Sequence, residues 1–208
     1  MTRLLLISGS TADSSPQTSA LRAAVRLVPP GVVAEVYDGL RHLPAFVPGE
    51  RAPRHVLAVR EGIAAADAVL FCTPEYAGSL PGSLKNLLDH VVAGGELGGK
   101  PVAWLSVSTP GQDEGARVAL ETVLAHCNAR LLHAACQRIP LTPHAVDGQG
   151  MVTEPQLHQA LFDMLQTLNR SLTDVQTRQQ PSWQIHSSVF PTIQRSVDRP
   201  TFQPRRRY

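Results

Sequence analysis

The chain has little cysteine, little net charge and no long apolar run. Its three cysteines, Cys72, Cys127 and Cys136, form neither a CxxC pair nor the spacing of a zinc site. We therefore expect buried thiols in a reducing compartment. No apolar run approaches the roughly 20 residues that a membrane-spanning helix needs.

The charge balance argues against nucleic acid as a general partner. The formal net charge is +2, and the excess lies in Arg205–Arg207 at the end of the chain. The short apolar run at the start stops at Ser8 and Gly9, whereas a signal peptide has a longer apolar region and a cleavage site of small residues. We expect this run to be a first strand, and the protein to be cytoplasmic.

Apolar runs and amphipathic segments alternate along the chain. Apolar segments predict strands over residues 4–7, 32–37, 68–72 and 101–107, and within 131–139, and the continuous run at 4–7 suits burial on both faces of a sheet. Helical periodicity predicts helices over residues 19–28, 54–66, 84–92, 116–127 and 154–172. This order favours right-handed crossovers and a parallel α/β sheet with helices on both faces.

From Thr173 onward the periodicity fades, and proline, glutamine and arginine are scattered through the sequence. We divide the chain into a domain of residues 1–172 and an extended or disordered C-terminal tail of residues 173–208. Trp183 and Phe190 are apolar points in this tail that could dock on a neighbouring subunit.

Three loops follow predicted strands, at the edge where parallel sheets bind ligands: residues 9–18, 73–83 and 108–115. The first, GSTADSSPQT, offers hydroxyls and main-chain N–H groups at a helix N-terminus, which favours an anion. It fits neither GxGxxG nor a Walker loop, so a single phosphate monoester is favoured over a pyrophosphate. An ordinary polar N-cap explains the same residues equally well.

The second loop and the helix after it resemble a family signature. Residues 73–90, TPEYAGSLPGSLKNLLDH, resemble the TPEYNxSxPGxLKNxxDW signature of NADPH-dependent FMN reductases, a branch of the flavodoxin-like proteins. The matching positions are Thr73, Pro74, Glu75, Tyr76, Ser79, Pro81, Gly82, Leu84, Lys85, Asn86 and Asp89. The resemblance implies that the flavin ring is lined by Pro74, Glu75, Tyr76, Ala77 and Gly78. Taken alone, Glu75 is more simply a loop carboxylate that is solvated or hydrogen-bonded to main chain than a catalytic acid.

The other two loops resemble segments of the same family. The first is similar to its GSxRxxSxN pattern, which implies a phosphate held by Ser10, Ser15, Gln17 and Thr18. The third is similar to SxSxGxxGGxRA and implies further flavin contacts from Ser108, Gly111 and Gly115. Residues 144–148, HAVDG, loosely resemble the family's FDxxG turn.

Several positions depart from the family's patterns. Ala12 stands where arginine is usual, Gln17 where asparagine or threonine is common, and Ala77 where asparagine is usual. Glu114 replaces the first glycine of the third pattern. Because arginine is the natural clamp for a phosphate, Ala12 predicts a weakened phosphate site.

The resemblance implies a flavodoxin-like three-layer sandwich with a five-stranded parallel sheet in the order 2-1-3-4-5. It further implies an FMN-dependent oxidoreductase with NAD(P)H as co-substrate, which reduces a flavin, a quinone or a similar small acceptor by ping-pong hydride transfer. Catalysis would rest on the flavin, with no metal and no catalytic side chain. Family resemblance also suggests a homodimer or homotetramer.

Other functions remain open from sequence. One is a flavin-binding or partner-docking protein of the same fold with weakened or no reductase activity. A flavodoxin-type electron carrier fits less well, since those proteins are usually strongly acidic and this chain is not. A phospho-acceptor domain would need a pair of aspartates after the first strand to hold Mg²⁺, and none follows it.

Overall fold

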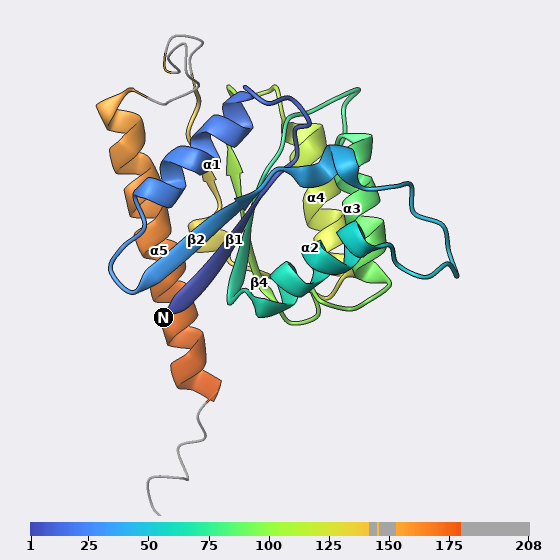
Figure 1. Cartoon of the computed structure of the whole chain (residues 1–208). Coiled ribbons are helices and arrows are strands. Elements are labelled where there is room, and N and C mark those ends of the chain that lie inside the picture. The colour runs from blue at the N-terminus through green and yellow to red at the C-terminus, as the bar shows by residue number, and fades with distance from the viewer. Residues whose placement is uncertain (142–144, 146–152, 180–208) are drawn as a thin grey trace, which may run out of the picture.

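The computed structural model describes residues 1–141, 145 and 153–179, and these form one parallel sheet with helices on both faces (Figure 1). The strands are β1 (Thr2–Ser8), β2 (Val32–Tyr37), β3 (Ala68–Cys72), β4 (Pro101–Ser106), β5 (Arg130–Leu131) and β6 (Gln137–Arg138). Their order is β2-β1-β3-β4-β5, with β6 also paired to β4. The predicted flavodoxin-like fold and strand order are confirmed.

The fifth position of the sheet differs from the prediction. A single strand was expected within residues 131–139, but a 3-10 turn, η2 (His133–Ala135), divides it into β5 and β6. Each half pairs two residues with β4, Arg130 with Pro101 and Gln137 with Leu105 at their starts. The turn places Ala135 in the core, where it is fully buried, and this burial accounts for the interruption.

Helices α1 (Pro16–Arg26) and α5 (Pro155–Gln179) cover one face of the sheet, and α2 (Arg54–Ala65), α3 (Gly82–Val92) and α4 (Glu114–His126) cover the other (Figure 1). A hydrophobic core lies on each face of the sheet, and successive residues of β1 point alternately into the two cores. Leu4 and Leu6 pack toward α1 and α5, while Leu5 and Ile7 pack toward α2, α3 and α4. Two-sided burial explains why these strands read as continuous apolar runs.

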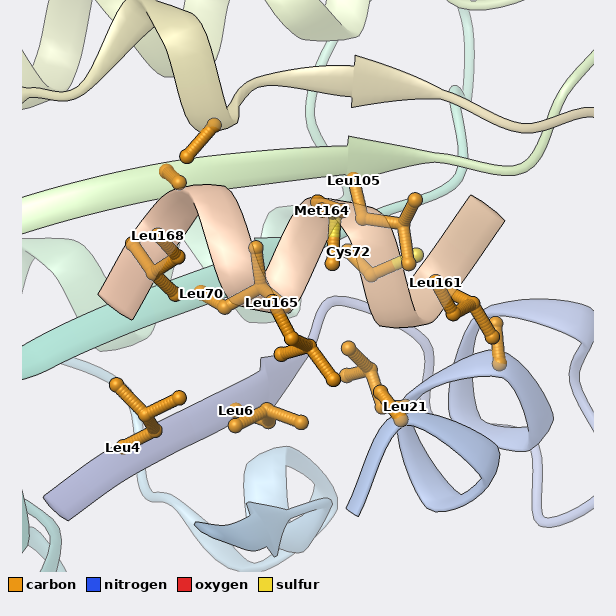
Figure 2. Close-up of a cluster of buried hydrophobic side chains, with 14 of the residues drawn as sticks. Leu4, Leu6, Leu21, Leu70, Cys72, Leu105, Leu161, Met164, Leu165 and Leu168 are labelled. Atoms are coloured by element: carbon orange, nitrogen blue, oxygen red, sulfur yellow. The ribbon is translucent and has the colours of Figure 1, made fainter. Parts of the chain in front are cut away.

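Helix α5 closes the first core. Its inward residues pack on side chains of β1, β3 and β4, including Leu6, Leu70 and Leu105 (Figure 2). The apolar side of the helix predicted over residues 154–172 is buried: Leu157, Leu161, Met164, Leu165 and Leu168. Burying each such side chain contributes roughly 1.5–3 kcal/mol, so this face alone fixes the helix on the sheet.

The end of α5 corrects the predicted boundary of the tail. The helix does not stop near Leu172 but continues to Gln179, so residues 173–179 are helical rather than extended or disordered. The remaining tail, with Trp183 and Phe190, lies outside the described residues. The division at residue 172 otherwise stays a prediction.

The cysteines behave as buried thiols. All three are free, Cys72 and Cys127 are buried, and burial raises the pKa of the Cys136 thiol to about 11. Burial, and next the charge of Asp113, raises the pKa of the Cys72 thiol further still. Within residues 1–141, 145 and 153–179, no helix is long and apolar enough to cross a membrane, and no cluster of three or more His, Cys, Asp or Glu could hold a metal ion.

Candidate functional site

The three loops singled out from the sequence meet at one edge of the sheet. β1, β3 and β4 are parallel neighbours, so the loops after them leave the sheet side by side. The Gly9 N–H donates to the Cys72 carbonyl at 2.8 Å, and a Cβ on Gly9 would lie 2.9 Å from the Cα of Thr73, so the first loop touches the start of the second. A Cβ on Gly115 would lie 2.7 Å from the carbonyl carbon of Gly78, which shows that the second and third loops touch through main chain.

The first loop is a hydroxyl network at the N-terminus of α1. The Ser15 hydroxyl accepts the Thr18 N–H at 3.1 Å and so caps the helix. It also donates to the Thr18 hydroxyl at 2.9 Å, which lies 2.8 Å from the Ser8 hydroxyl. The Ser10 hydroxyl accepts the Ala12 N–H at 3.2 Å and keeps its own proton for an external acceptor. The polar N-cap and a phosphate cradle are thus compatible in one loop.

The second loop carries a tight two-residue hairpin. Tyr76 and Ser79 exchange two main-chain hydrogen bonds of 3.0 Å. Between them Ala77 has φ of 50° and Gly78 has φ of 72°, the left-handed pair of a type I′ turn. Tyr76 is 56% exposed, and Ala77 and Gly78 are also exposed, so the hairpin offers ring surface and main chain to a ligand.

Ala77 is poorly suited to its left-handed conformation. We expect Ala77→Asn to raise the free energy of unfolding by about 0.5–1 kcal/mol, because a left-handed conformation costs most L-residues about 1–2 kcal/mol and asparagine tolerates it best. Urea denaturation measures the change. Ala77→Gly serves as a parallel test with the same expected sign, and Ala77→Val should destabilise. A loss of stability in both the asparagine and the glycine variants would contradict the turn assignment.

Glu75 links the second loop to α4. Its carboxylate accepts the N–H of Ala116 at 2.9 Å, in the first turn of α4, where the side chain of Asp113 makes no cap of its own. Of the interpretations of Glu75, a carboxylate hydrogen-bonded to main chain is thereby confirmed. The carboxylate occupies the positive end of α4 and disfavours a phosphate there. The first turn of α1 has no acidic residue, so an anion is favoured on that side of the edge.

The third loop is held by an arginine from β6. The Arg138 guanidinium donates to Asp113 at 2.6 Å and to Glu114 at 3.1 Å. The Asp113 side chain is only 5% exposed, so this ion pair supplies the partner that a buried carboxylate requires. Hydrogen bonds to Glu114, first from the Gly111 main chain and also from Arg138, lower the pKa of its carboxyl.

The other predicted residues of the third loop lie at the same edge. Ser108 is half-buried, and Gly111 is exposed with φ of 89°, a conformation that favours glycine. Below them the Ser106 hydroxyl is buried at the end of β4 and has no hydrogen-bond partner among the described residues. Ser106 is one of the residues that line a small cavity, together with Thr73, Asp113 and Ala116.

The residues present fit FMN. The first loop supplies neutral hydroxyls and main-chain donors for a phosphate. The hairpin offers exposed main chain for the polar edge of a ring, and the second and third loops touch through main chain at its base.

Other singled-out residues have structural roles. Lys85 pairs with Asp89, four residues further along α3, at 2.6 Å. The Asn86 amide and the His90 ring both hydrogen-bond the Pro44 carbonyl, at 2.8 and 3.1 Å, and so fix the segment after η1 (Gly39–His42) on α3. Arg117 lies over the ring of the half-buried Trp104. In the HAVDG segment, Ala145 is buried and the rest lies outside the described residues.

Two residues at this edge escaped the sequence analysis. Arg138 was included only as part of a predicted strand, and Arg41 fell in a segment expected to be loop. Arg41 contacts the first loop through Thr11 and Asp13. No sequence spacing points to either contact, because each partner lies on a different element.

A parallel sheet of this order, with polar loops joined at its carboxyl edge, defines the class of flavodoxin-like proteins. The family model described as NADPH-dependent FMN reductase matches residues 2–136, and the chain belongs to that family. An FMN-dependent oxidoreductase that uses NAD(P)H, as the sequence predicted, is thereby confirmed.

Individual relatives agree with the family. An NAD(P)H-dependent FMN reductase of Pseudomonas aeruginosa is 35% identical over 173 residues, covering 80% of this chain and 92% of that protein. A probable NADPH:quinone oxidoreductase of Oryza sativa is 30% identical over 183 residues, covering 80% and 86%. The solved structure of FerB, a flavoenzyme NAD(P)H:(acceptor) oxidoreductase of Paracoccus denitrificans, superposes with a TM-score of 0.68 at 22% identity, covering 82% and 98%.

Proposed function

We propose that the three loops together hold FMN at the carboxyl edge of the sheet. Ser10, Ser15, Gln17 and Thr18 would hold the phosphate. The ring would lie along the hairpin and the third loop, against Pro74, Glu75, Tyr76, Ala77, Gly78, Ser108, Gly111 and Gly115. The observation that carries this proposal is the direct joining of the loops, through the Glu75–Ala116 hydrogen bond and the main-chain contact of Gly115 with Gly78.

The protein's own residues would position the flavin ring and leave one side of it open to solvent. When bound, FMN supplies the capacity to accept a hydride and pass it on. Glu75 and Arg138 fix the two loops that would flank the ring, while Tyr76, Ala77 and Gly78 stay open to solvent. Glu75 is engaged with main chain, which supports a site without a catalytic acid or base. NAD(P)H and the acceptor would use the same open side in turn, which gives ping-pong kinetics.

We propose a flavin or a quinone as the acceptor. The names of the Pseudomonas and Oryza relatives cover these two classes of acceptor. An open, largely main-chain surface beside the ring places few demands on the shape of a planar acceptor.

We further propose that α3 faces a second copy of the chain in a homodimer or homotetramer. Tyr76, just before α3, and Val92 at its end are large apolar side chains that are 56% and 48% exposed in the single chain. Sedimentation of the full chain tests this proposal. The three free thiols support a reducing, cytoplasmic location.

Steady-state kinetics of the FMN-loaded protein test the proposed function. The purified protein is titrated with FMN, and NAD(P)H oxidation is followed at several concentrations of a soluble quinone. We expect saturable flavin binding and parallel double-reciprocal plots. Flavin binding without NAD(P)H oxidation would favour the flavin-binding or docking alternative. A protein that binds no flavin and oxidises no NAD(P)H would reject the proposal.

A further inference from the structure

The first loop has no positive charge of its own. Residues 9–18 contain Asp13 but neither lysine nor arginine, although a phosphate monoester carries up to two negative charges. Hydroxyls and main-chain donors alone would have to offset that charge. A cation supplied by another element would complete the site, because charge-assisted hydrogen bonds are about twice as strong as neutral ones.

Arg41 brings such a cation to the loop. Its Nη2 donates to the Thr11 carbonyl at 2.8 Å, and both terminal nitrogens contact the Asp13 carboxylate, Nη1 at 3.4 Å. Thr11 and Asp13 flank Ala12, so the guanidinium lies beside the position whose side chain is a single methyl group. Ala12 is exposed, and nothing in the described residues closes that position from solvent.

The fold directs Arg41 to this place. β2 pairs in parallel with β1, and Tyr37 is the register partner of Ile7, so η1 leaves the sheet next to the first loop. Leu40 is 2% exposed and anchors η1 in the core on the α2 side. The neighbouring Arg41 therefore projects from a fixed point rather than from a free loop.

The ion pair with Asp13 leaves Arg41 able to exchange partners. The Asp13 side chain is 82% exposed and the Arg41 side chain 39% exposed, and exposed pairs of this kind contribute little stability. A guanidinium has five N–H donors, and the single one on Nε is not used in the contacts described. A phosphate on the first loop would compete with Asp13 for the same donors and offers more negative charge.

We infer that Arg41 is the cationic ligand of the FMN phosphate, supplied from η1 in place of a cation within the first loop. Asp13 holds the guanidinium beside the loop until the phosphate takes its donors. This inference rests on the proposed function and assigns to it a residue outside the three loops.

FMN and riboflavin separate this role from a structural one, because riboflavin lacks the phosphate. We expect Arg41→Ala to weaken FMN binding about 10- to 100-fold, the range for a hydrogen bond to a charged group, and to change riboflavin binding less than about twofold. Arg22→Ala is the matched control, since Arg22 also forms an exposed ion pair, with Asp38 at 3.0 Å, and among the described residues its side chain has no hydrogen bond to the first loop. It should leave both affinities unchanged.

Two further variants are expected to raise the affinity for FMN. In the Arg41→Ala background, Ala12→Arg should restore FMN affinity to within about threefold of wild type, because it returns a guanidinium to the same side of the loop. In the otherwise wild-type chain, Asp13→Asn should tighten FMN binding about two- to fivefold, since it removes the competing carboxylate.

The outcomes distinguish the inference from the proposed function. If Arg41→Ala binds FMN as wild type does, or loses FMN and riboflavin equally, the inference is overturned while the flavin site stands. If the wild type binds neither flavin, the proposed function fails and the inference fails with it. Fluorescence quenching of each flavin gives all the dissociation constants, independently of any activity.

Discussion

Replacement of Gly115 by alanine is expected to weaken FMN binding by about a hundredfold, roughly 3 kcal/mol, and to lower the free energy of unfolding by about 1–3 kcal/mol. The new Cβ would lie 2.7 Å from the Gly78 carbonyl carbon and closer still to its oxygen. Both partners are main chain, so no side-chain rotation relieves the overlap. The second and third loops must separate, and the Glu75–Ala116 hydrogen bond that joins them is lost.

A second glycine provides the matched control. Gly62 lies inside α2, and a Cβ there would meet its nearest neighbour, Cδ2 of Leu5, at an ordinary 3.8 Å. Gly62→Ala should therefore stabilise the protein by about 0.5–1 kcal/mol through helix propensity and leave flavin binding unchanged. Urea denaturation and flavin titration of both variants give the comparison. Wild-type FMN affinity in Gly115→Ala would show that the two loops do not meet at the flavin.

Arg138→Ala should lower the free energy of unfolding by about 2–4 kcal/mol, a little below the usual cost of breaking a buried ion pair because the Arg138 side chain is itself 25% exposed. The cost arises from the Asp113 carboxylate, which is 5% exposed in the intact protein and loses its 2.6 Å partner. Because Asp113 and Glu114 lie in the third loop, that loop should loosen, and FMN affinity should fall with stability.

Two controls isolate the buried pair. Arg22→Ala breaks an ion pair whose side chains are 48% and 50% exposed, and it should cost less than about 1 kcal/mol. Adding Asp113→Asn to Arg138→Ala removes the orphaned charge and should recover part of the lost stability. Urea denaturation measures all four proteins, including wild type. Equal losses in Arg138→Ala and Arg22→Ala would contradict the proposed clamp on the third loop.

Most of the sheet could be predicted because it is buried on both faces. β3 is buried at every position and begins and ends at the predicted residues, and β2 does so too, although it is an edge strand buried only at Val32, because Gly31 and Asp38 bound it. β5 and β6 could not be separated, because the turn between them depends on burial of Ala135 against the first core. The end of α5 was missed because TDVQTRQ, residues 173–179, has no apolar stripe that marks a helix.

The candidate site was predicted as three loops but not as a connected structure. The motifs placed Ser10, Tyr76 and Gly111 at the carboxyl edge, because a turn is formed by residues that are consecutive in the sequence. The contacts that join the loops are long-range: Glu75 and Ala116 are 41 residues apart, and Arg138 and Asp113 are 25 apart. Such pairs depend on the packing of whole elements, so the roles of Arg41 and Arg138 emerged only from the structure.

A crystal structure of the full chain grown with FMN tests the central claim most directly. We expect the phosphate within hydrogen-bond distance of the main chain and hydroxyls of residues 10–18 and of the Arg41 guanidinium. The ring should lie along residues 74–78 with the third loop beside it. A flavin bound elsewhere on the molecule, or loops that stand apart when FMN is bound, would contradict the claim that this edge of the sheet is the flavin site.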